Sequence, residues 1–120
     1  MRWTILMPVL TLLPAVQAQA PSRTVKELKA FYRATCAKCH GPDGSGQSAD
    51  GKRLTATDFT DAAKMAKGSD AMMVKTIRKG IFFGVVMHPF KNRLTQAEAL
   101  LLVQRVLRKA EKGKVIAPAG

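Results

Sequence analysis

The chain has 120 residues, with 20 Lys and Arg against 8 Asp and Glu, a formal charge of +12. This length accommodates one domain, and a mean hydropathy of −0.04 with 47% hydrophobic residues excludes intrinsic disorder. The two cysteines, only three positions apart, exclude the disulfide framework of a small secreted scaffold. No apolar run reaches the roughly 20 residues of a membrane-spanning helix. We therefore expect one small domain without a membrane span.

The first residues are typical of a secretory signal peptide. Arg2 precedes an apolar stretch over residues 3–16, and small residues follow. Cleavage fits after Ala18 or after Ala20, and the first site is preferred because the second leaves a proline as the first mature residue. An uncleaved anchor is the alternative, but the stretch is short and contains two prolines. Export predicts a periplasmic protein with a formal charge of +11, since Arg2 is removed. The predicted division is residues 1–18 as signal peptide, 19–112 as the domain and 113–120 as a C-terminal tail.

Helical patterns begin soon after the signal. Ser22 can cap a helix that carries Leu28 and Tyr32 on its apolar face and runs into Cys36. Glycines and small polar residues then predict a loop over residues 41–51. A short helical piece is expected from about residue 59 to residue 66.

Two longer helices complete the predicted domain. Ser69 and Asp70 begin the first, and Gly80 ends it. A more apolar loop follows over residues 81–93. Thr95-Gln96-Ala97-Glu98 forms a capping box for the second helix, which Gly113 closes. No run alternates as a β-strand does, so the predicted fold class is all-α.

The most informative motif is Cys36-Ala37-Lys38-Cys39-His40. On a helical turn, positions i, i+3 and i+4 share one face, so both cysteines can reach the two vinyl groups along one edge of a haem. His40 can then place its imidazole beneath the iron. A thioredoxin-type redox pair would need a βαβ context that is absent. A zinc site would need two further ligands, and His88 is the only other histidine. The motif therefore predicts one covalently attached haem c.

Several further elements give the chain a family resemblance. Residues from about Lys26 to Lys109 resemble the small bacterial class I c-type cytochromes. That resemblance implies a helical fold in which the N- and C-terminal helices cross beside the haem, and electron transfer as the activity. In one departure, the usual aromatic partner of Tyr32 on the last helix is replaced by Arg105, which either stacks on Tyr32 or turns outwards. The matching segments are Phe31-Tyr32, residues 36–44, residues 58–61, Ser69-Asp70, Ile77, Gly80 and residues 87–94.

The resemblance also implies a methionine as the second axial ligand of the iron. Met87 stands at the position of that ligand, judged by its distance to Phe90 and Leu94. His88 is the rival, because imidazole also binds haem iron, and it separates Met87 from the proline that usually follows directly. The resemblance therefore implies that Cys36, Cys39, His40 and Met87 bind the cofactor, with His40 and Met87 on the iron.

This ligand set leaves no open iron position, so an electron carrier is expected rather than an enzyme such as a peroxidase. The chain is either a free carrier between redox proteins or the haem subunit of a larger dehydrogenase or sulfur-oxidising complex, and accordingly a monomer or part of a hetero-complex. An exported protein has no access to nucleic acid. Its basic residues, among them Lys38, Lys91 and Arg93, are either a solvated surface or a ring that steers docking to acidic redox partners.

Overall fold

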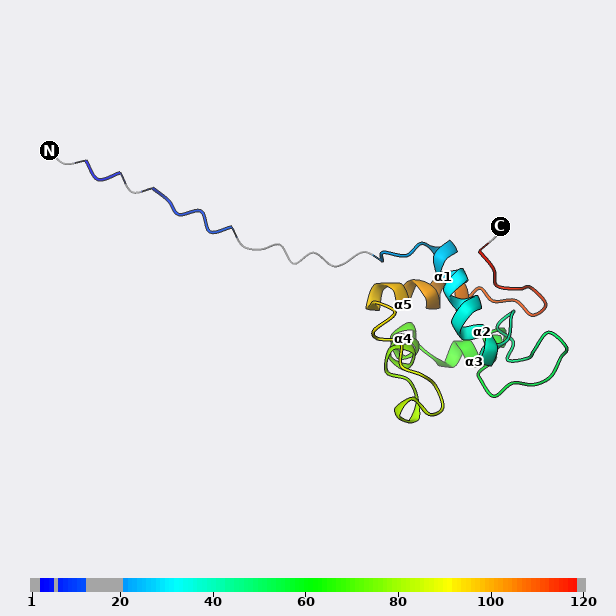
Figure 1. Ribbon diagram of the computed structural model, residues 1–120. Helices are drawn as coiled ribbons and strands as arrows, with labels where there is room; N and C mark the ends of the chain where they lie inside the picture. The colour runs from blue at the N-terminus through cyan, green and yellow to red at the C-terminus, as the bar shows by residue number, and fades with distance from the viewer. Residues whose placement is uncertain (1–2, 6, 13–20, 119–120) are drawn as a thin grey trace.

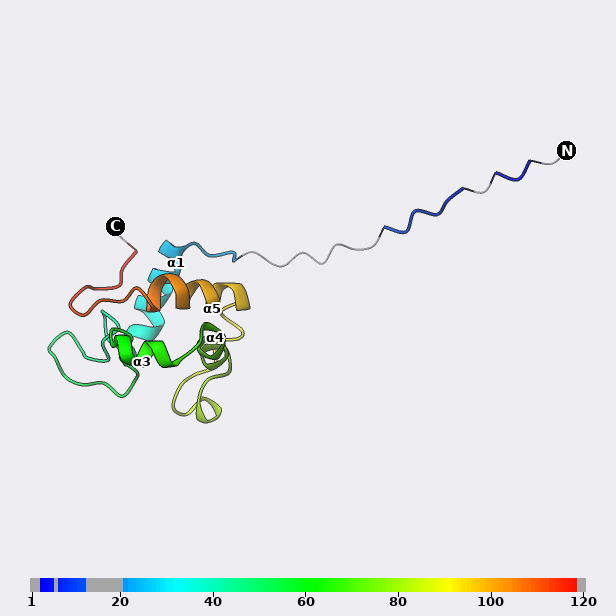
Figure 2. The same cartoon turned by 180° about the vertical axis from the view of Figure 1, so that it is seen from behind.

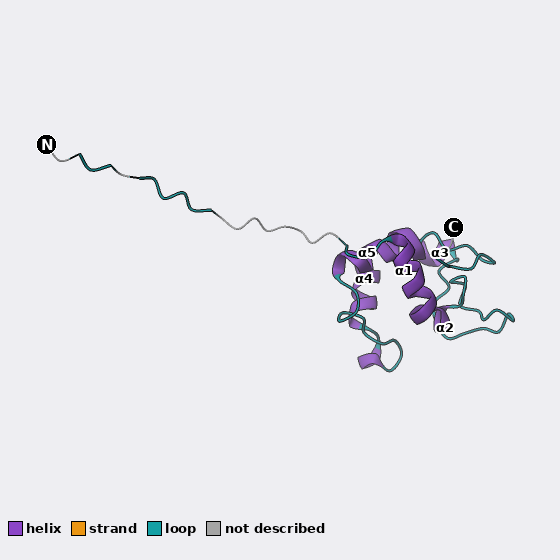
Figure 3. Cartoon of the chain, turned by 45° about the horizontal axis from the view of Figure 1, so that its top comes forward, coloured by secondary structure: helices purple, strands orange, loops and turns teal. Residues whose placement is uncertain are grey.

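A computed structural model describes residues 3–5, 7–12 and 21–118 of the chain. These residues form helices and loops without a β-strand, as predicted, and only two isolated bridges pair extended segments (Figure 3). The α-helices are α1 (Val25–Phe31), α2 (Ala37–His40), α3 (Ala62–Lys67), α4 (Asp70–Lys79) and α5 (Gln96–Leu102) (Figure 1).

The predicted signal peptide falls partly within the described residues. Residues 3–5 and 7–12 are irregular and exposed, and both predicted cleavage sites lie outside the described residues. Within the described part of the chain, no helix is long and apolar enough to cross a membrane.

The first helix begins two residues later than predicted and is not a continuous α-helix. Thr24, not Ser22, caps α1, because its side chain accepts a hydrogen bond from the backbone N–H of Glu27. A π-helical turn, Tyr32–Cys36, then joins α1 to α2, and the N–H of Ala37 donates to the carbonyl of Tyr32 five residues earlier. The extra residue in this turn rotates the cysteine motif relative to the apolar face of α1.

The last helix has the predicted capping box but ends early. The Thr95 hydroxyl accepts from the N–H of Glu98, whose carboxylate accepts from the N–H of Thr95. After α5 the chain forms a second π-helical turn, Val103–Leu107, and does not continue as a helix to Gly113. The helical part of this last segment therefore ends at Leu107, six residues before Gly113.

The N- and C-terminal helices cross, as the family resemblance implied (Figure 2). Tyr32 and Leu102 are almost fully buried, and Val106 is buried as well. Arg105 is exposed. Arg105 therefore turns outwards and does not stack on Tyr32. The aliphatic side chains of Leu102 and Val106 complete the helix crossing.

The central helices follow their predicted caps. Ser69 caps α4, and Gly80 ends it with a positive φ. The guanidinium of Arg108 then fixes the connection between α3 and α4, since it donates to Asp70 Oδ1 at 2.6 Å, to the carbonyl of Gly68 at 2.7 Å and to that of Met65 at 3.0 Å. The end of the last helix is thereby tied to the middle of the chain.

The C-terminal segment also packs onto the domain. Ile116 is buried, and its N–H donates to the carbonyl of Pro42 at 2.8 Å. Three residues before Ile116, the N–H of Gly113 donates to Asp43 Oδ2 at 2.8 Å. Residues 113–116 are thus held against the loop that follows the cysteine motif.

Candidate functional site

The cysteine motif lies where the first helix ends. Cys36 closes the π-helical turn and is half-buried against the hydrophobic core, while Cys39 lies in α2 and is exposed. Both thiols are free. In the chain without haem, burial raises the pKa of the Cys36 thiol to about 12, against a smaller opposing effect of Arg93.

His40 is held by three contacts from the loop that follows it. Its Nδ1 lies 3.1 Å from the carbonyl oxygen of Thr57, and its ring stacks on Phe59 with 4.3 Å between centroids and 18° between planes. Its own carbonyl accepts from the N–H of Gly46 at 2.7 Å. A carbonyl only accepts, so the bond to Thr57 places the proton on Nδ1 and leaves Nε2 as the free nitrogen.

The electrostatics agree with a neutral imidazole at this position. Burial lowers the pKa of His40 below its ordinary value, and the hydrogen bond to Thr57 offsets only part of this effect. A neutral ring with Nε2 free is the form that binds a metal. The Thr57 carbonyl is therefore the partner that fixes the tautomer of His40 in this structure.

Gly41 forms the turn that directs the chain away from the motif. Its φ is +83°, and a Cβ at this position would lie 2.3 Å from the carbonyl oxygen of Gln47. The carbonyl of Gly41 accepts from the buried Tyr32 hydroxyl at 2.7 Å. Burial raises the pKa of Tyr32, so the phenol remains a donor across the ordinary pH range.

Met87 comes from a separate hairpin between α4 and α5. The N–H of Ile81 donates to the carbonyl of Met87 at 3.0 Å, and the N–H of Met87 donates back at 3.3 Å. Met87 is half-buried and packs against the same hydrophobic core as Cys36. His88 is exposed, with its ring edge-on to Phe90 at 5.4 Å.

The structure thus brings Cys36, Cys39 and His40 together within five consecutive residues and places Met87 on a different element, which packs against the same core as Cys36. Among the described residues, no group of three or more His, Cys, Asp or Glu side chains could hold a bare metal ion.

Comparisons with known proteins identify the family of the chain. Residues 23–104 match the model of the family described as cytochrome C oxidase, cbb3-type, subunit III. The chain belongs to this family of c-type cytochromes. No curated protein sequence matches it.

Two solved structures of c-type cytochromes resemble the chain. A point mutant of Kustc0563 is 36% identical with a TM-score of 0.55, over 68% of this chain and 95% of that chain. The KustC0563 c-type cytochrome is 31% identical with a TM-score of 0.51, over 70% of this chain and 96% of that chain. The cytochrome described here is therefore an electron-transfer protein with covalently bound haem c.

The residues present fit this cofactor. Two free thiols three positions apart precede an imidazole whose Nδ1 is occupied by a carbonyl, and a thioether lies on a second element packed on the same core. Sequence reasoning missed Phe59 as the residue that stacks on His40. The only signal was its place beside Asp58, whose carboxylate accepts from the N–H of Thr60 and forms the turn at this point.

Proposed function

We propose that the cytochrome is a periplasmic monohaem carrier of single electrons. In this proposal Cys36 and Cys39 form thioether bonds to the haem, and His40 and Met87 are the axial ligands of its iron. The observation that carries the proposal is the bond between His40 Nδ1 and the Thr57 carbonyl, because it orients the ring and leaves Nε2 for the metal.

Bound haem c supplies a one-electron Fe(III)/Fe(II) couple, and the protein sets its potential through the axial ligands. A methionine thioether favours ferrous iron and gives a higher potential than a second histidine. The three contacts to His40 hold the imidazole in one orientation through both oxidation states. Two protein ligands leave no position for peroxide, so we expect no peroxidase activity.

The proposed location rests on the N-terminal sequence. A signal peptide over residues 1–18, cleaved after Ala18 or Ala20, would export the chain and leave residues 19–112 as the cytochrome domain. Covalent haem attachment supports this, because c-type cytochromes mature outside the cytoplasm.

The partners proposed are redox proteins with acidic docking surfaces. Lys38 is exposed within the motif itself, and Lys91 and Arg93 are exposed just after the Met87 hairpin. Cations at these positions would attract an acidic partner towards the haem and speed its association at low salt. The second candidate, a haem subunit held in a larger oxidoreductase complex, uses the same surface. Purification of the native protein separates them: a free carrier elutes at its own mass, and a subunit elutes with its complex.

Covalent attachment provides the direct test. Acid-acetone extraction should leave the haem with the polypeptide, and haem in the organic layer would contradict thioether attachment. A variant with Cys36→Ser and Cys39→Ser should yield no stable holoprotein. The matched control is Ser48→Ala, in the loop beyond the motif, which should retain its haem. Voltammetry of the holoprotein should then give one reversible one-electron wave.

A further inference from the structure

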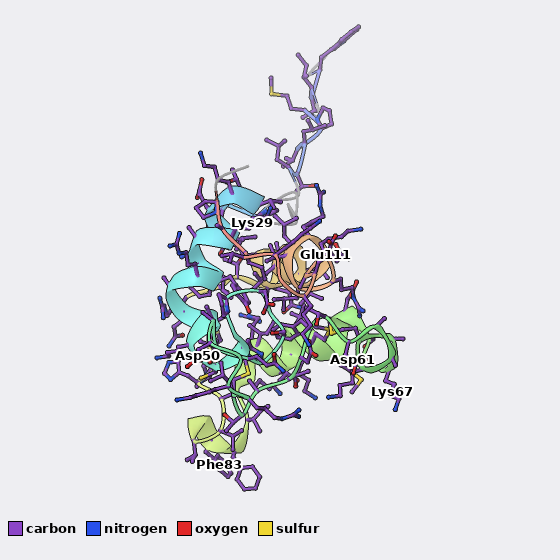
Figure 4. The ribbon with its side chains drawn as sticks, turned by 90° about the vertical axis from the view of Figure 1, so that its right-hand side faces the viewer. Lys29, Asp50, Asp61, Lys67, Phe83 and Glu111 are labelled. Atoms are coloured by element: carbon purple, nitrogen blue, oxygen red, sulfur yellow. The ribbon has the colours of Figure 1, made fainter. Side chains whose placement is uncertain are left out.

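One apolar surface of the domain has no role in the core or in the proposed site. Ile81, Phe82, Phe83, Val85 and Val86, here called the apolar tip, form the end of the Met87 hairpin. Their exposed fractions are 40%, 75%, 105%, 86% and 66%. Figure 4 shows Phe83 at the far end of the domain, with its ring pointing away from the other side chains. The tip is therefore a convex projection with five solvated apolar side chains.

The backbone of the tip is unfavourable for the residues that occupy it. Phe82 and Phe83 both have a φ of +53°, in the left-handed region that bulky side chains rarely adopt. The N–H of Gly84 donates to the carbonyl of Ile81 at 3.2 Å, which closes a tight turn between them. Turns of this kind favour Asn-Gly. Two phenylalanines here neither ease the turn nor fill the core, and this favours a role for their side chains in a contact outside the core.

Basic residues flank the apolar tip on both sides in the sequence. The N–H of Lys91 donates to the carbonyl of Arg78 at 3.1 Å. The segment that follows the hairpin therefore lies beside the end of α4, next to Lys79. Residues 71–97 contain five Lys and Arg and no Asp or Glu. The surface thus combines a projecting apolar tip with a positively charged base.

This combination fits the interface of an anionic membrane. Aromatic and aliphatic side chains enter the boundary between headgroups and acyl chains, while lysines remain at the level of the phosphates. A projecting tip can enter a fluid bilayer without a matching cavity, whereas a protein partner would need a pocket of complementary shape. We propose that the apolar tip is a membrane-docking element, which inserts Phe82 and Phe83 into an anionic lipid surface while Lys79 and Lys91 contact its phosphates.

The inference goes beyond electron transfer and does not depend on a redox partner. If the cytochrome is exported as proposed, docking would keep it at the membrane surface without a spanning helix. The test therefore uses purified holoprotein and vesicles alone. Failure to bind vesicles would leave the carrier function intact, and failure of the haem assignments would leave vesicle binding intact.

The experiment is vesicle flotation, with bound protein measured by its haem absorbance. The vesicles contain phosphatidylcholine alone or equal parts of phosphatidylcholine and phosphatidylglycerol. The holoprotein should float with the anionic vesicles in low salt and not with the neutral ones, and high salt should weaken binding because it screens the lysines. Absence of flotation with anionic vesicles would overturn the proposal.

Two double variants separate the contribution of the phenylalanines to vesicle binding from that of the lysines. Phe82→Asn with Phe83→Gly suits the positive φ values, so it should fold normally and lower the partition coefficient at least about tenfold. Lys79→Gln with Lys91→Gln should lower it roughly twentyfold, since each basic side chain near the surface is worth about fivefold. Unchanged binding of the tip variant would overturn insertion and leave only non-specific charge attraction.

Matched controls lie within four residues of Glu111 in the sequence, and Figure 4 shows Glu111 well away from Phe83. Val115→Ser removes a valine that is 62% exposed, close to the 66% of Val86, and should leave binding unchanged. Lys109→Gln with Lys112→Gln removes two exposed charges. This pair should lower vesicle binding less than Lys79→Gln with Lys91→Gln.

Two other occupants of the tip would be recognised by the same variants. Sedimentation without lipid should give a monomer. A dimer that the Asn-Gly variant abolishes would instead assign the tip to a second copy of the chain. The absorbance spectrum and potential of the Asn-Gly variant should match those of the parent. A shift in either would show that the tip covers the haem, and would overturn membrane docking.

Discussion

The hydroxyl of Tyr32 donates to the carbonyl oxygen of Gly41 at 2.7 Å, across the complete cysteine motif. Tyr32 begins the π-helical turn that leads to Cys36, and Gly41 is the first residue after His40. One buried hydrogen bond therefore joins the two ends of the segment that we propose binds the haem.

Removal of this hydroxyl should weaken the fold without changing its shape. Tyr32→Phe keeps the ring in the helix crossing but removes the shorter of two hydrogen bonds to the buried Gly41 carbonyl, which keeps only the Gly44 N–H at 3.3 Å. This loss should cost about 1 kcal/mol of unfolding free energy. Chemical denaturation of the holoprotein measures this loss. An unchanged unfolding free energy would show that water replaces the phenol at no cost.

Substitutions at Met87 and His88 identify the second axial ligand. Met87→Ala should abolish the weak far-red charge-transfer band of ferric haem with His/Met ligation, and should lower the potential. His88→Ala is the matched control, because the exposed imidazole lies edge-on to Phe90 and should leave both quantities nearly unchanged. If instead His88→Ala changed the band and the potential while Met87→Ala left both unchanged, the iron would have two histidine ligands. Spectra near neutral pH avoid exchange of the methionine for a lysine.

The packing of the Met87 hairpin can be tested through a glycine pair. Gly80 and Gly51 have similar φ values, +75° and +83°, but only Gly80 is crowded. A Cβ at Gly80 would lie 2.4 Å from the carbonyl oxygen of Met87, whereas at Gly51 nothing lies within 4 Å. Gly51→Ala should therefore cost only the backbone strain, about 1 kcal/mol. Gly80→Ala should cost roughly 3 kcal/mol or more and weaken the far-red band, because it displaces the hairpin. Equal costs, measured by thermal unfolding, would contradict this account of the hairpin.

The buried carboxylate of Glu98 predicts a loss of stability in acid. Burial raises the pKa of Glu98, but hydrogen bonds from Thr95, the charge of Arg23 and the hydroxyl of Ser22 together outweigh burial and lower it. Glu98 is only 2% exposed, with Arg23 Nη1 3.1 Å from Oε2 and the Thr95 N–H 3.0 Å from Oε1. Since its pKa is lower in the folded chain than in the unfolded one, the stabilisation is present above the unfolded pKa and disappears as the pH falls through the folded pKa.

Thermal unfolding between about pH 6 and pH 3 measures this contribution. Glu98→Gln should be less stable than the parent by about 1–3 kcal/mol at neutral pH, because the ion pair with Arg23 is lost. The difference should shrink towards acid, where the parent carboxyl is protonated. A constant difference across the range would assign the pH dependence to other carboxylates.

Local chemistry explains which elements could be predicted from the sequence. The capping box at Thr95, the cap at Ser69 and the stop at Gly80 each depend on residues within one helical turn, and all three are confirmed. The predicted start of α1 was wrong because the hydroxyls of both Ser22 and Thr24 could cap this helix. Thr24 satisfies the N–H of Glu27, while the hydroxyl of Ser22 is engaged by Glu98, a residue 76 positions away.

Features of the candidate site that depend on distant residues could not be predicted. The π-helical turn over Tyr32–Cys36 leaves no local signature, since the same residues would form an ordinary α-helix. The Thr57 carbonyl lies 17 residues from His40, and any carbonyl of the intervening loop has the same chemistry. The roles of Cys36, Cys39, His40 and Met87 in binding the haem stay predictions.

The bonds from Ile116 to Pro42 and from Gly113 to Asp43 also bear on the order in which the domain is assembled. During synthesis the cysteine motif emerges more than 70 residues before the segment that packs against the loop behind it. The contacts of that loop are therefore complete only once residues 113–116 have packed against it, because these two bonds come from that later segment. Until then we expect this loop and the cysteine motif before it to be more open, and the cysteines to be more accessible for haem attachment. Truncation before Gly113 should prolong this open state and expose the loop to proteolysis.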